Sequence, residues 1–165
     1  MSTGNPASIN PDDVLSEEER ATHRKFAAGC FNGTWDLLDK KDRAPQEDFD
    51  MIHMSHASRY HWGQIGTPLE FARGDWQLSR VYAVLGMGDT ARTYAQNSLD
   101  HCLANGIGDF DLAFAYEALA RACRINGDQK ELDLYLALAT QAGENISDEG
   151  DRIYFFKELK TVSYP

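Results

Sequence analysis

Apolar residues recur every three or four positions along most of this chain, and that spacing places them on one face of an α-helix. No segment shows the sustained alternation of apolar and polar residues that is typical of a half-buried strand. The pattern therefore predicts an all-α chain of seven helices. It is clearest in two facing stripes: Leu112, Ala115, Leu119 and Ala122, and then Leu132, Tyr135, Leu136, Ala139 and Ala142.

Start and stop signals place the ends of these helices. Ser16 and Glu19 form a capping box, and the run 67–70 combines an N-cap threonine, a proline and a capping glutamate. Gly29 and Gly33 lie inside the first helix, so we expect either a kink there or a neighbour packed close to the backbone. The expected helices cover residues 16–39, 45–62, 67–86, 89–105, 109–126, 128–143 and 148–160.

The chain also contains an internal repeat, because residues 78–102 match residues 119–143 after a shift of 41 positions. Self-similarity of this size indicates stacked units, here a helix, a tight glycine turn and a second helix. The matched pairs are Leu78 and Leu119, Ser79 and Ala120, Arg80 and Arg121, Gly86 and Gly127, Tyr94 and Tyr135, and Ser98 and Ala139. We expect a flexible tail over residues 1–12 and one domain over 13–165, with units at about 16–64, 67–105 and 109–143 and a cap at 148–160.

These units resemble the tetratricopeptide repeat. In that family, the first helix carries a large residue, then Leu beside a small residue, then an aromatic residue three positions later. Trp76, Leu78-Ser79 and Tyr82 match that pattern, followed by Ala91 and Ser98 in the second helix, whereas the second unit has Cys123 and Leu132 at two of the positions. The resemblance implies a right-handed stack of antiparallel helix pairs. The span 56–122 is also similar to uncharacterised bacterial helical-repeat proteins, which implies no activity.

In tetratricopeptide arrays the first helices line a concave groove that binds peptides, so the resemblance implies such a groove here. The groove positions carried over to this chain are Arg73, Trp76, Arg80, Val84, Phe114, Glu117, Arg121 and Ile125, with Arg124 close by. Guanidinium groups form bidentate pairs with carboxylates, and tryptophan is frequent at binding hot spots. We therefore expect a protein or peptide partner, with an acidic segment or a C-terminal carboxylate as the favoured ligand.

The same arginines also have a purely structural interpretation. Glu117 lies four residues before Arg121, which is the favourable order for an intrahelical ion pair, and Glu70 lies one turn from Arg73. Arginine stems can in addition cover apolar surface. The groove could also be filled by the N-terminal tail or by a second copy of the chain, and the sequence leaves these alternatives open.

A histidine-rich segment offers an alternative function. His53, His56 and Tyr60 share a helix face, and His61 follows directly. A histidine-lined pocket of this kind would suit an enzyme or a small-molecule sensor. We expect no metal, since a metal needs a third ligand and an orienting carboxylate, and the chain has no HExxH motif. Packed or hydrogen-bonded core histidines are the simpler interpretation.

The amino-acid composition disfavours several classes of function. The 165 residues contain 16 Lys and Arg against 26 Asp and Glu, a net charge of −10, which disfavours binding to nucleic acid or to anionic membranes. Cys30, Cys102 and Cys123 lie far apart without a CxxC pair, so we expect free thiols and a cytoplasmic location. No signal peptide, membrane span, nucleophile elbow or cofactor motif is evident. The sequence favours a non-catalytic scaffold without a cofactor. A homodimer is a possible assembly of this scaffold.

Overall fold

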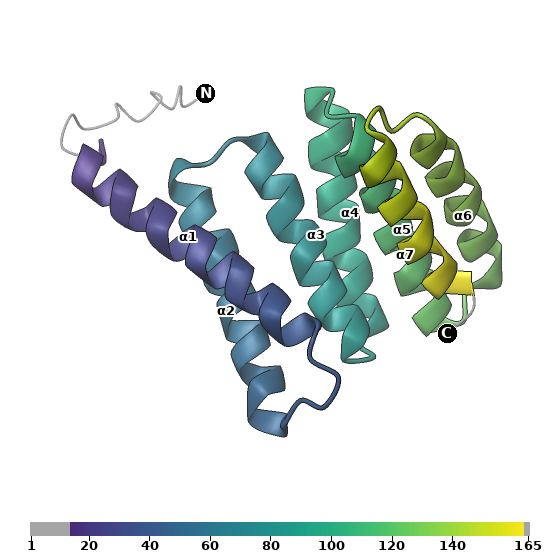
Figure 1. The fold of residues 1–165 in the computed structure, drawn as a ribbon, viewed down its shortest axis with the longest axis horizontal. Coiled ribbons are helices and arrows are strands. Elements are labelled where there is room, and N and C mark those ends of the chain that lie inside the picture. Colours follow the sequence, from purple (N-terminus) through teal and green to yellow (C-terminus); the bar gives the residue numbers. More distant parts are fainter. Residues whose placement is uncertain (1–13, 164–165) are drawn as a thin grey trace, which may run out of the picture.

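The chain folds into a stack of α-helices (Figure 1). The structure is a computed structural model, and it describes residues 14–163, which contain seven helices and no strand. The all-α prediction is therefore confirmed, while the predicted tail over residues 1–12 lies outside the described residues. The helices are α1 (Glu17–Leu38), α2 (Pro45–Ile65), α3 (Pro68–Val84), α4 (Gly88–Asn105), α5 (Asp109–Asn126), α6 (Gln129–Glu144) and α7 (Glu149–Ser163).

Local capping chemistry explains most of the helix ends. At the start of α1, the Ser16 hydroxyl accepts from the Glu19 amide at 3.3 Å, and the Glu19 carboxylate accepts from the Ser16 amide at 2.8 Å. At the ends of α4 and α5, Gly106 and Gly127 adopt the left-handed conformation, with φ of 64° and 73°.

One predicted start differs from the structure. The N-cap of α4 is Met87, so Asp89 lies in the first turn of the helix and does not cap it. The Asp89 carboxylate instead accepts a hydrogen bond of 3.0 Å from the side-chain amide of Asn126. This carboxylate therefore ties the start of α4 to the end of α5.

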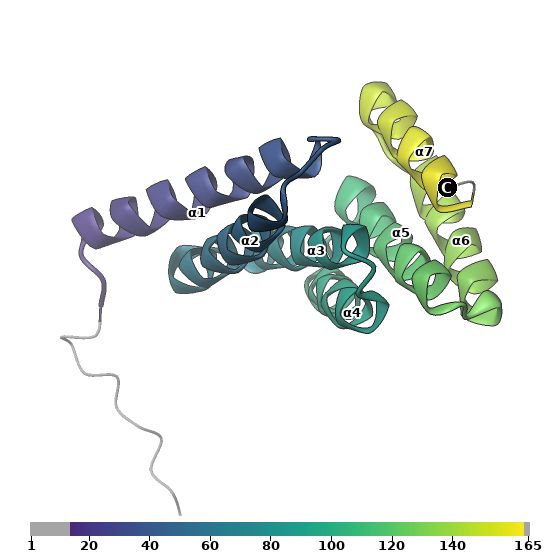
Figure 2. The ribbon, with the colours of Figure 1, turned by 90° about the horizontal axis from the view of Figure 1, so that it is seen from below.

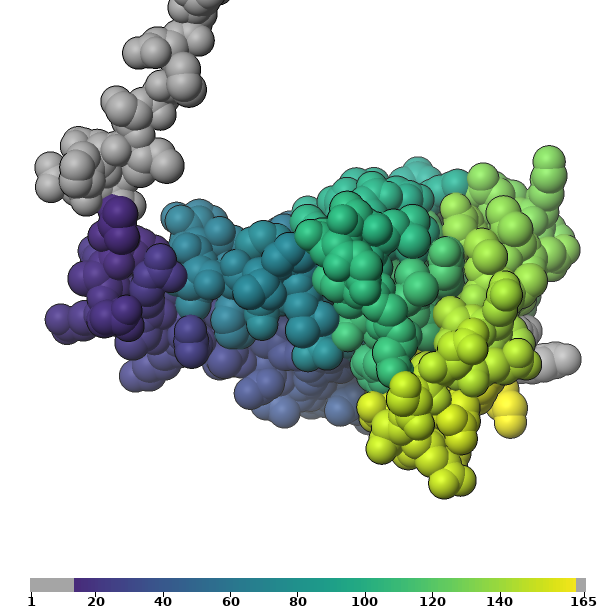
Figure 3. Space-filling view, turned by 90° about the horizontal axis from the view of Figure 1, so that it is seen from above, coloured from purple at the N-terminus to yellow at the C-terminus, as the bar shows by residue number. Residues whose placement is uncertain are grey.

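The helices pack as a stack in which each helix contacts the next. The odd-numbered helices also contact one another in order, α1 with α3, α3 with α5 and α5 with α7, whereas α1 and α7 do not touch. In Figure 2, α1 and α7 lie on the same side of α3 and α5. Figure 3 shows α1 and α7 at opposite ends of the stack. We call the surface formed by α1, α3, α5 and α7 the concave face.

Small residues allow the helices to approach closely. Ala72, Ala95, Ala115 and Ala118 form one core cluster with Leu119, on helices α3, α4 and α5. A second cluster joins Ala113 and Phe114 of α5 to α6 and to Phe155 and Leu159 of α7. The last helix therefore covers the end of the stack, because its apolar side continues the same core.

One of the two interior glycines of α1, Gly33, has the close neighbour that the sequence suggested. The helix runs through both positions, and a β-carbon at Gly33 would overlap the side chain of Met54 on α2. A β-carbon at Gly29 would meet open space. Close packing thus explains Gly33 but not Gly29.

The cysteines and the hydropathy of the helices add two findings. All three cysteines are free thiols, as predicted, and Cys102 and Cys123 are buried in the core. Burial raises the pKa of the Cys102 thiol to about 11, so this group stays protonated at neutral pH. None of the helices within residues 14–163 is long and apolar enough to cross a membrane.

The contact between α6 and α7 can be tested with two glycine substitutions. A β-carbon at Gly143 would overlap the buried ring of Phe155, so we expect Gly143→Ala to lower the free energy of unfolding by about 1–3 kcal/mol. Gly29→Ala is the matched control, and it should stabilise the protein by about 0.5–1 kcal/mol because alanine is the better helix former. Urea denaturation measures both values, and a Gly143→Ala variant as stable as the wild type would contradict this packing.

Candidate functional site

Five aromatic side chains form a row from α1 to α7 along the concave face, and one of them, Phe114, is buried at 2% exposure. Phe31 and Trp35 belong to α1, Trp76 to α3, Phe114 to α5 and Tyr154 to α7. Successive ring centroids lie 6.3, 5.2, 5.0 and 5.9 Å apart, which is the range of favourable aromatic pairs. We call these five residues the aromatic strip. It connects all four helices of the concave face, and its outermost member, Tyr154, is 44% exposed.

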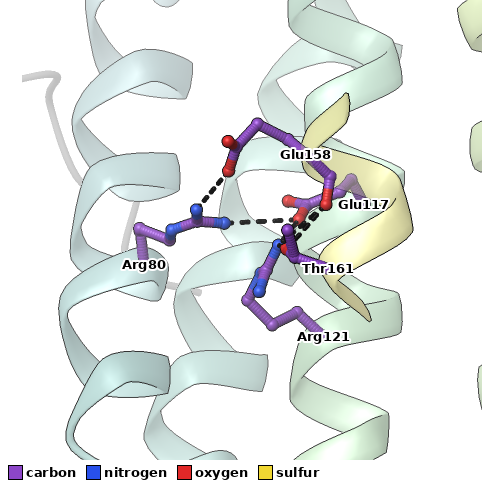
Figure 4. Close-up of polar contacts among 5 residues, drawn as sticks. All are labelled: Arg80, Glu117, Arg121, Glu158 and Thr161. Atoms are coloured by element: carbon purple, nitrogen blue, oxygen red, sulfur yellow. Dashed lines mark hydrogen bonds and ion pairs between the residues drawn. The ribbon is translucent and has the colours of Figure 1, made fainter. Parts of the chain in front are cut away.

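A network of charged side chains lies between α3, α5 and α7 (Figure 4). Arg80 of α3 pairs with Glu158 of α7 and, at 3.4 Å, with Glu117 of α5. Arg121 donates from Nε to the same Glu117 oxygen at 2.9 Å, and from a terminal nitrogen to the Thr161 hydroxyl at 2.8 Å. We call Arg80, Glu117, Arg121, Glu158 and Thr161 the ionic network. It joins three helices of the concave face.

Burial and charge explain why these side chains gather. The Glu117 side chain is 1% exposed, and a carboxylate at that depth is stable only when cations neutralise it. Arg80 and Arg121 supply two positive charges on the same Glu117 oxygen, and Glu158 restores a net charge of zero. The second Glu117 oxygen is buried and has no hydrogen-bond partner among the described residues.

The remaining two arginines are more accessible. Arg73 forms two hydrogen bonds to Asp111, of 2.7 and 3.0 Å, and its side chain is 48% exposed. Hydrogen bonding to Asp111 raises the pKa of Arg73, so this guanidinium is always charged. Arg124 is exposed, and within residues 14–163 no carboxylate lies within ion-pair distance of it. It borders a cavity of about 170 Å³ between α3, α5 and α7, whose wall includes Val84, Ile125, Thr161 and Val162.

The predicted binding residues lie on the two central helices of the concave face, Arg73, Trp76 and Arg80 on α3 and Glu117, Arg121 and Arg124 on α5. The ionic network brings Arg80, Glu117 and Arg121 together, whereas Arg73 pairs with Asp111 and Arg124 borders the cavity beside α7. The intrahelical pair between Glu117 and Arg121 is confirmed, so the structural interpretation of these arginines holds for part of the set.

The residues that sequence analysis missed belong to α1 and α7. Phe31 and Trp35 lie in a helix where the repeat is weak, and Tyr154, Glu158 and Thr161 lie in the predicted cap. A signal for the cap residues exists in the spacing, because Glu158 lies 41 residues after Glu117, just as Arg121 lies 41 residues after Arg80. The cap helix therefore continues the charge pattern of the repeat.

The histidines of α2 make two separate sets of contacts. His56 lies 2.8 Å from the Tyr82 hydroxyl and packs edge-on against the rings of Tyr82 and Tyr94. The Nδ1 atom of His61 lies 2.9 Å from Nδ1 of His23 on α1.

The other two members of the predicted histidine site are open to solvent. Tyr60 is 62% exposed, and His53 is exposed beside a cavity between α1 and α2. No group of three potential metal ligands occurs in the part of the chain that the structure describes.

A buried carboxylate also organises the neighbouring helices. Asp75 of α3 is 4% exposed, and its two oxygens pair with Arg59 of α2 at 2.9 Å and with His101 of α4 at 3.4 Å. Burial raises the pKa of Asp75 although both partners act in the opposite direction. Because both oxygens are engaged, we interpret this cluster as a structural link between three helices.

No family model, curated protein or solved structure matches this chain. A functional proposal for this protein therefore rests on the arrangement of its side chains.

Histidine titration tests the environment of α2. Burial, and to a smaller extent the charge of a neighbouring histidine, lowers the pKa values of His56 and His61 below 6.5. The unfolded chain then takes up protons first, so the free energy of unfolding should decrease as the pH falls below about 6.5. NMR titration of the imidazole protons measures both pKa values. A His56 that titrates at or above 6.5 would contradict the described packing.

Proposed function

We propose that this protein is a non-catalytic scaffold that binds a segment of another protein, or a peptide, across the concave face. The observation that carries the proposal is the aromatic strip, which crosses four helices and is exposed in part. The resemblance to tetratricopeptide repeats supports the same use of this face. We also propose a cytoplasmic location, in keeping with the free thiols.

Aromatic and arginine side chains are the residue types that contribute most at binding hot spots. Tyr154 and Trp35 offer ring surface at low conformational cost, since an aromatic side chain has few rotatable bonds. The Trp76 indole nitrogen is buried without a hydrogen-bond acceptor among the described residues.

The arginines favour an acidic segment or a C-terminal carboxylate as the partner. Arg73 and Arg124 are the accessible cations, and they lie on different helices of the concave face. A protein with a net charge of −10 repels acidic partners at long range, so specific arginines must provide the attraction at close range. The partner therefore needs apolar side chains for the aromatic strip together with carboxylates for these arginines.

Peptide binding by exposed-site variants tests the proposal. An acidic peptide library is screened against the wild type, and the affinity of the selected peptides is measured for Arg73→Gln/Arg124→Gln and for Tyr154→Ser. We expect each variant to bind about tenfold more weakly, which corresponds to roughly 1.4 kcal/mol. Lys130→Gln on α6 is the control, because Lys130 is exposed outside the concave face.

Variants at Arg80 and Arg121 are less suitable for this experiment, since each removes one of the two cations that neutralise the buried Glu117. Circular dichroism checks that each variant folds as the wild type does. Equal affinity of the wild type and both concave-face variants would reject the proposed binding face.

A further inference from the structure

Glu158 differs from the other members of the ionic network in how firmly it is held. We propose that its carboxylate occupies a carboxylate-binding site of the concave face, and that an acidic side chain of the partner binds there by replacing it. This inference rests on the proposed function, and it names the group that the partner must present.

The two glutamates of the network have unequal environments. Glu117 is 1% exposed and accepts from both Arg80 and Arg121, so its position is fixed from two helices. Glu158 is 17% exposed, and its carboxylate has a single cationic partner, Arg80. The Glu158 side chain can therefore turn toward solvent while Glu117 stays in place.

Rotation of Glu158 does not require α7 to move. The helix is anchored by Phe155, Leu159 and Val162, which are 0%, 7% and 2% exposed. These residues lie on the buried side of α7, whereas Tyr154 and Glu158 are four residues apart and share the side that faces α3 and α5. The exchange is then a change of one side chain on a fixed scaffold.

The charges that stay behind define the incoming group. Without Glu158, the site contains Arg80, Arg121 and Glu117, which carry a net charge of +1 in a half-buried position. One carboxylate restores neutrality, and a guanidinium group binds a carboxylate through two parallel hydrogen bonds. The site therefore selects one carboxylate and disfavours a neutral or basic group.

The side chains around Arg80 indicate which residues of the partner should flank its carboxylate. Trp76 lies one turn before Arg80 on α3, and Tyr154 lies one turn before Glu158 on α7. Burial and the nearby charge of Glu158 raise the pKa of Tyr154. An acidic residue flanked by an apolar or aromatic residue fits this combination of a cation and ring surfaces.

Chemical rescue tests the site without knowledge of the partner. Glu158→Ala removes the internal carboxylate and leaves room for acetate as the probe. At equal ionic strength, we expect sodium acetate to raise the melting temperature of this variant above its value in sodium chloride, by about 2–4 °C. The wild type and the Arg80→Ala/Glu158→Ala double variant should respond equally to both salts. Equal melting temperatures of Glu158→Ala in the two salts would overturn the proposed site.

Competition with a peptide tests the exchange itself. An acidic peptide selected against the wild type should bind Glu158→Gln about tenfold more tightly, because the glutamine no longer competes for Arg80. Because glutamine has the same shape as glutamate, the Glu158→Gln variant can be used in this peptide experiment even if Glu158→Ala does not fold. If acetate stabilises Glu158→Ala but the peptide binds Glu158→Gln no more tightly than the wild type, the carboxylate site stands. The proposal that the partner uses this site would then be overturned. If no peptide binds either protein, the proposed function fails, and the acetate result alone decides the carboxylate site.

Discussion

The burial of one carboxylate, Glu117, constrains the arrangement of three helices. A charge at this depth is unfavourable unless cations lie within hydrogen-bonding distance. One cation, Arg121, comes from the same helix, and the other, Arg80, comes from α3. Because two cations meet one carboxylate, a second carboxylate is needed, and Glu158 of α7 provides it. Three helices must therefore adopt one relative position for the charges to balance.

Apolar packing and the ionic network contribute different properties to this stack. Burial of Phe114, Leu119 and Phe155 supplies most of the stabilisation, but apolar contacts depend little on direction. Hydrogen bonds between guanidinium and carboxylate groups are directional, so they can discriminate between helix registers of similar apolar burial. Trp76 and Tyr154 lie one helical turn from this network, because they precede Arg80 on α3 and Glu158 on α7 by four residues. We infer that fold specificity and the proposed binding surface depend on the same few residues.

The sequence predicted the helices well because their signals are local. Capping residues, glycine stops and the periodic apolar stripes lie within a few positions of each helix end, and α1 to α7 begin and end close to the expected residues. The pair between Glu117 and Arg121 was predictable for the same reason. The start of α4 shows the limit, since the sequence places it at Asp89, whereas the N-cap is Met87 and Asp89 lies in the first turn, where it contacts Asn126.

Contacts distant in sequence were harder to predict. Arg80 and Glu158 are 78 residues apart, and their pairing depends on how three units stack. The histidines illustrate the same point, because His56 and His61, which the sequence assigns to one candidate pocket, contact different helices in the structure. Arg80 and Arg121 lie 41 residues apart, as do Glu117 and Glu158, and this spacing indicates part of the arrangement. The sequence alone, however, predicts only a capping role for α7.

The central claim is that the ionic network fixes α7 against α3 and α5. A double-mutant cycle between Arg80→Met and Glu158→Gln, measured by urea denaturation, tests it most directly. The account predicts a coupling energy of about 1–3 kcal/mol between the two residues, as expected for a half-buried, charged pair. A coupling energy indistinguishable from zero would show that α7 is held by apolar contacts alone, and it would contradict the account.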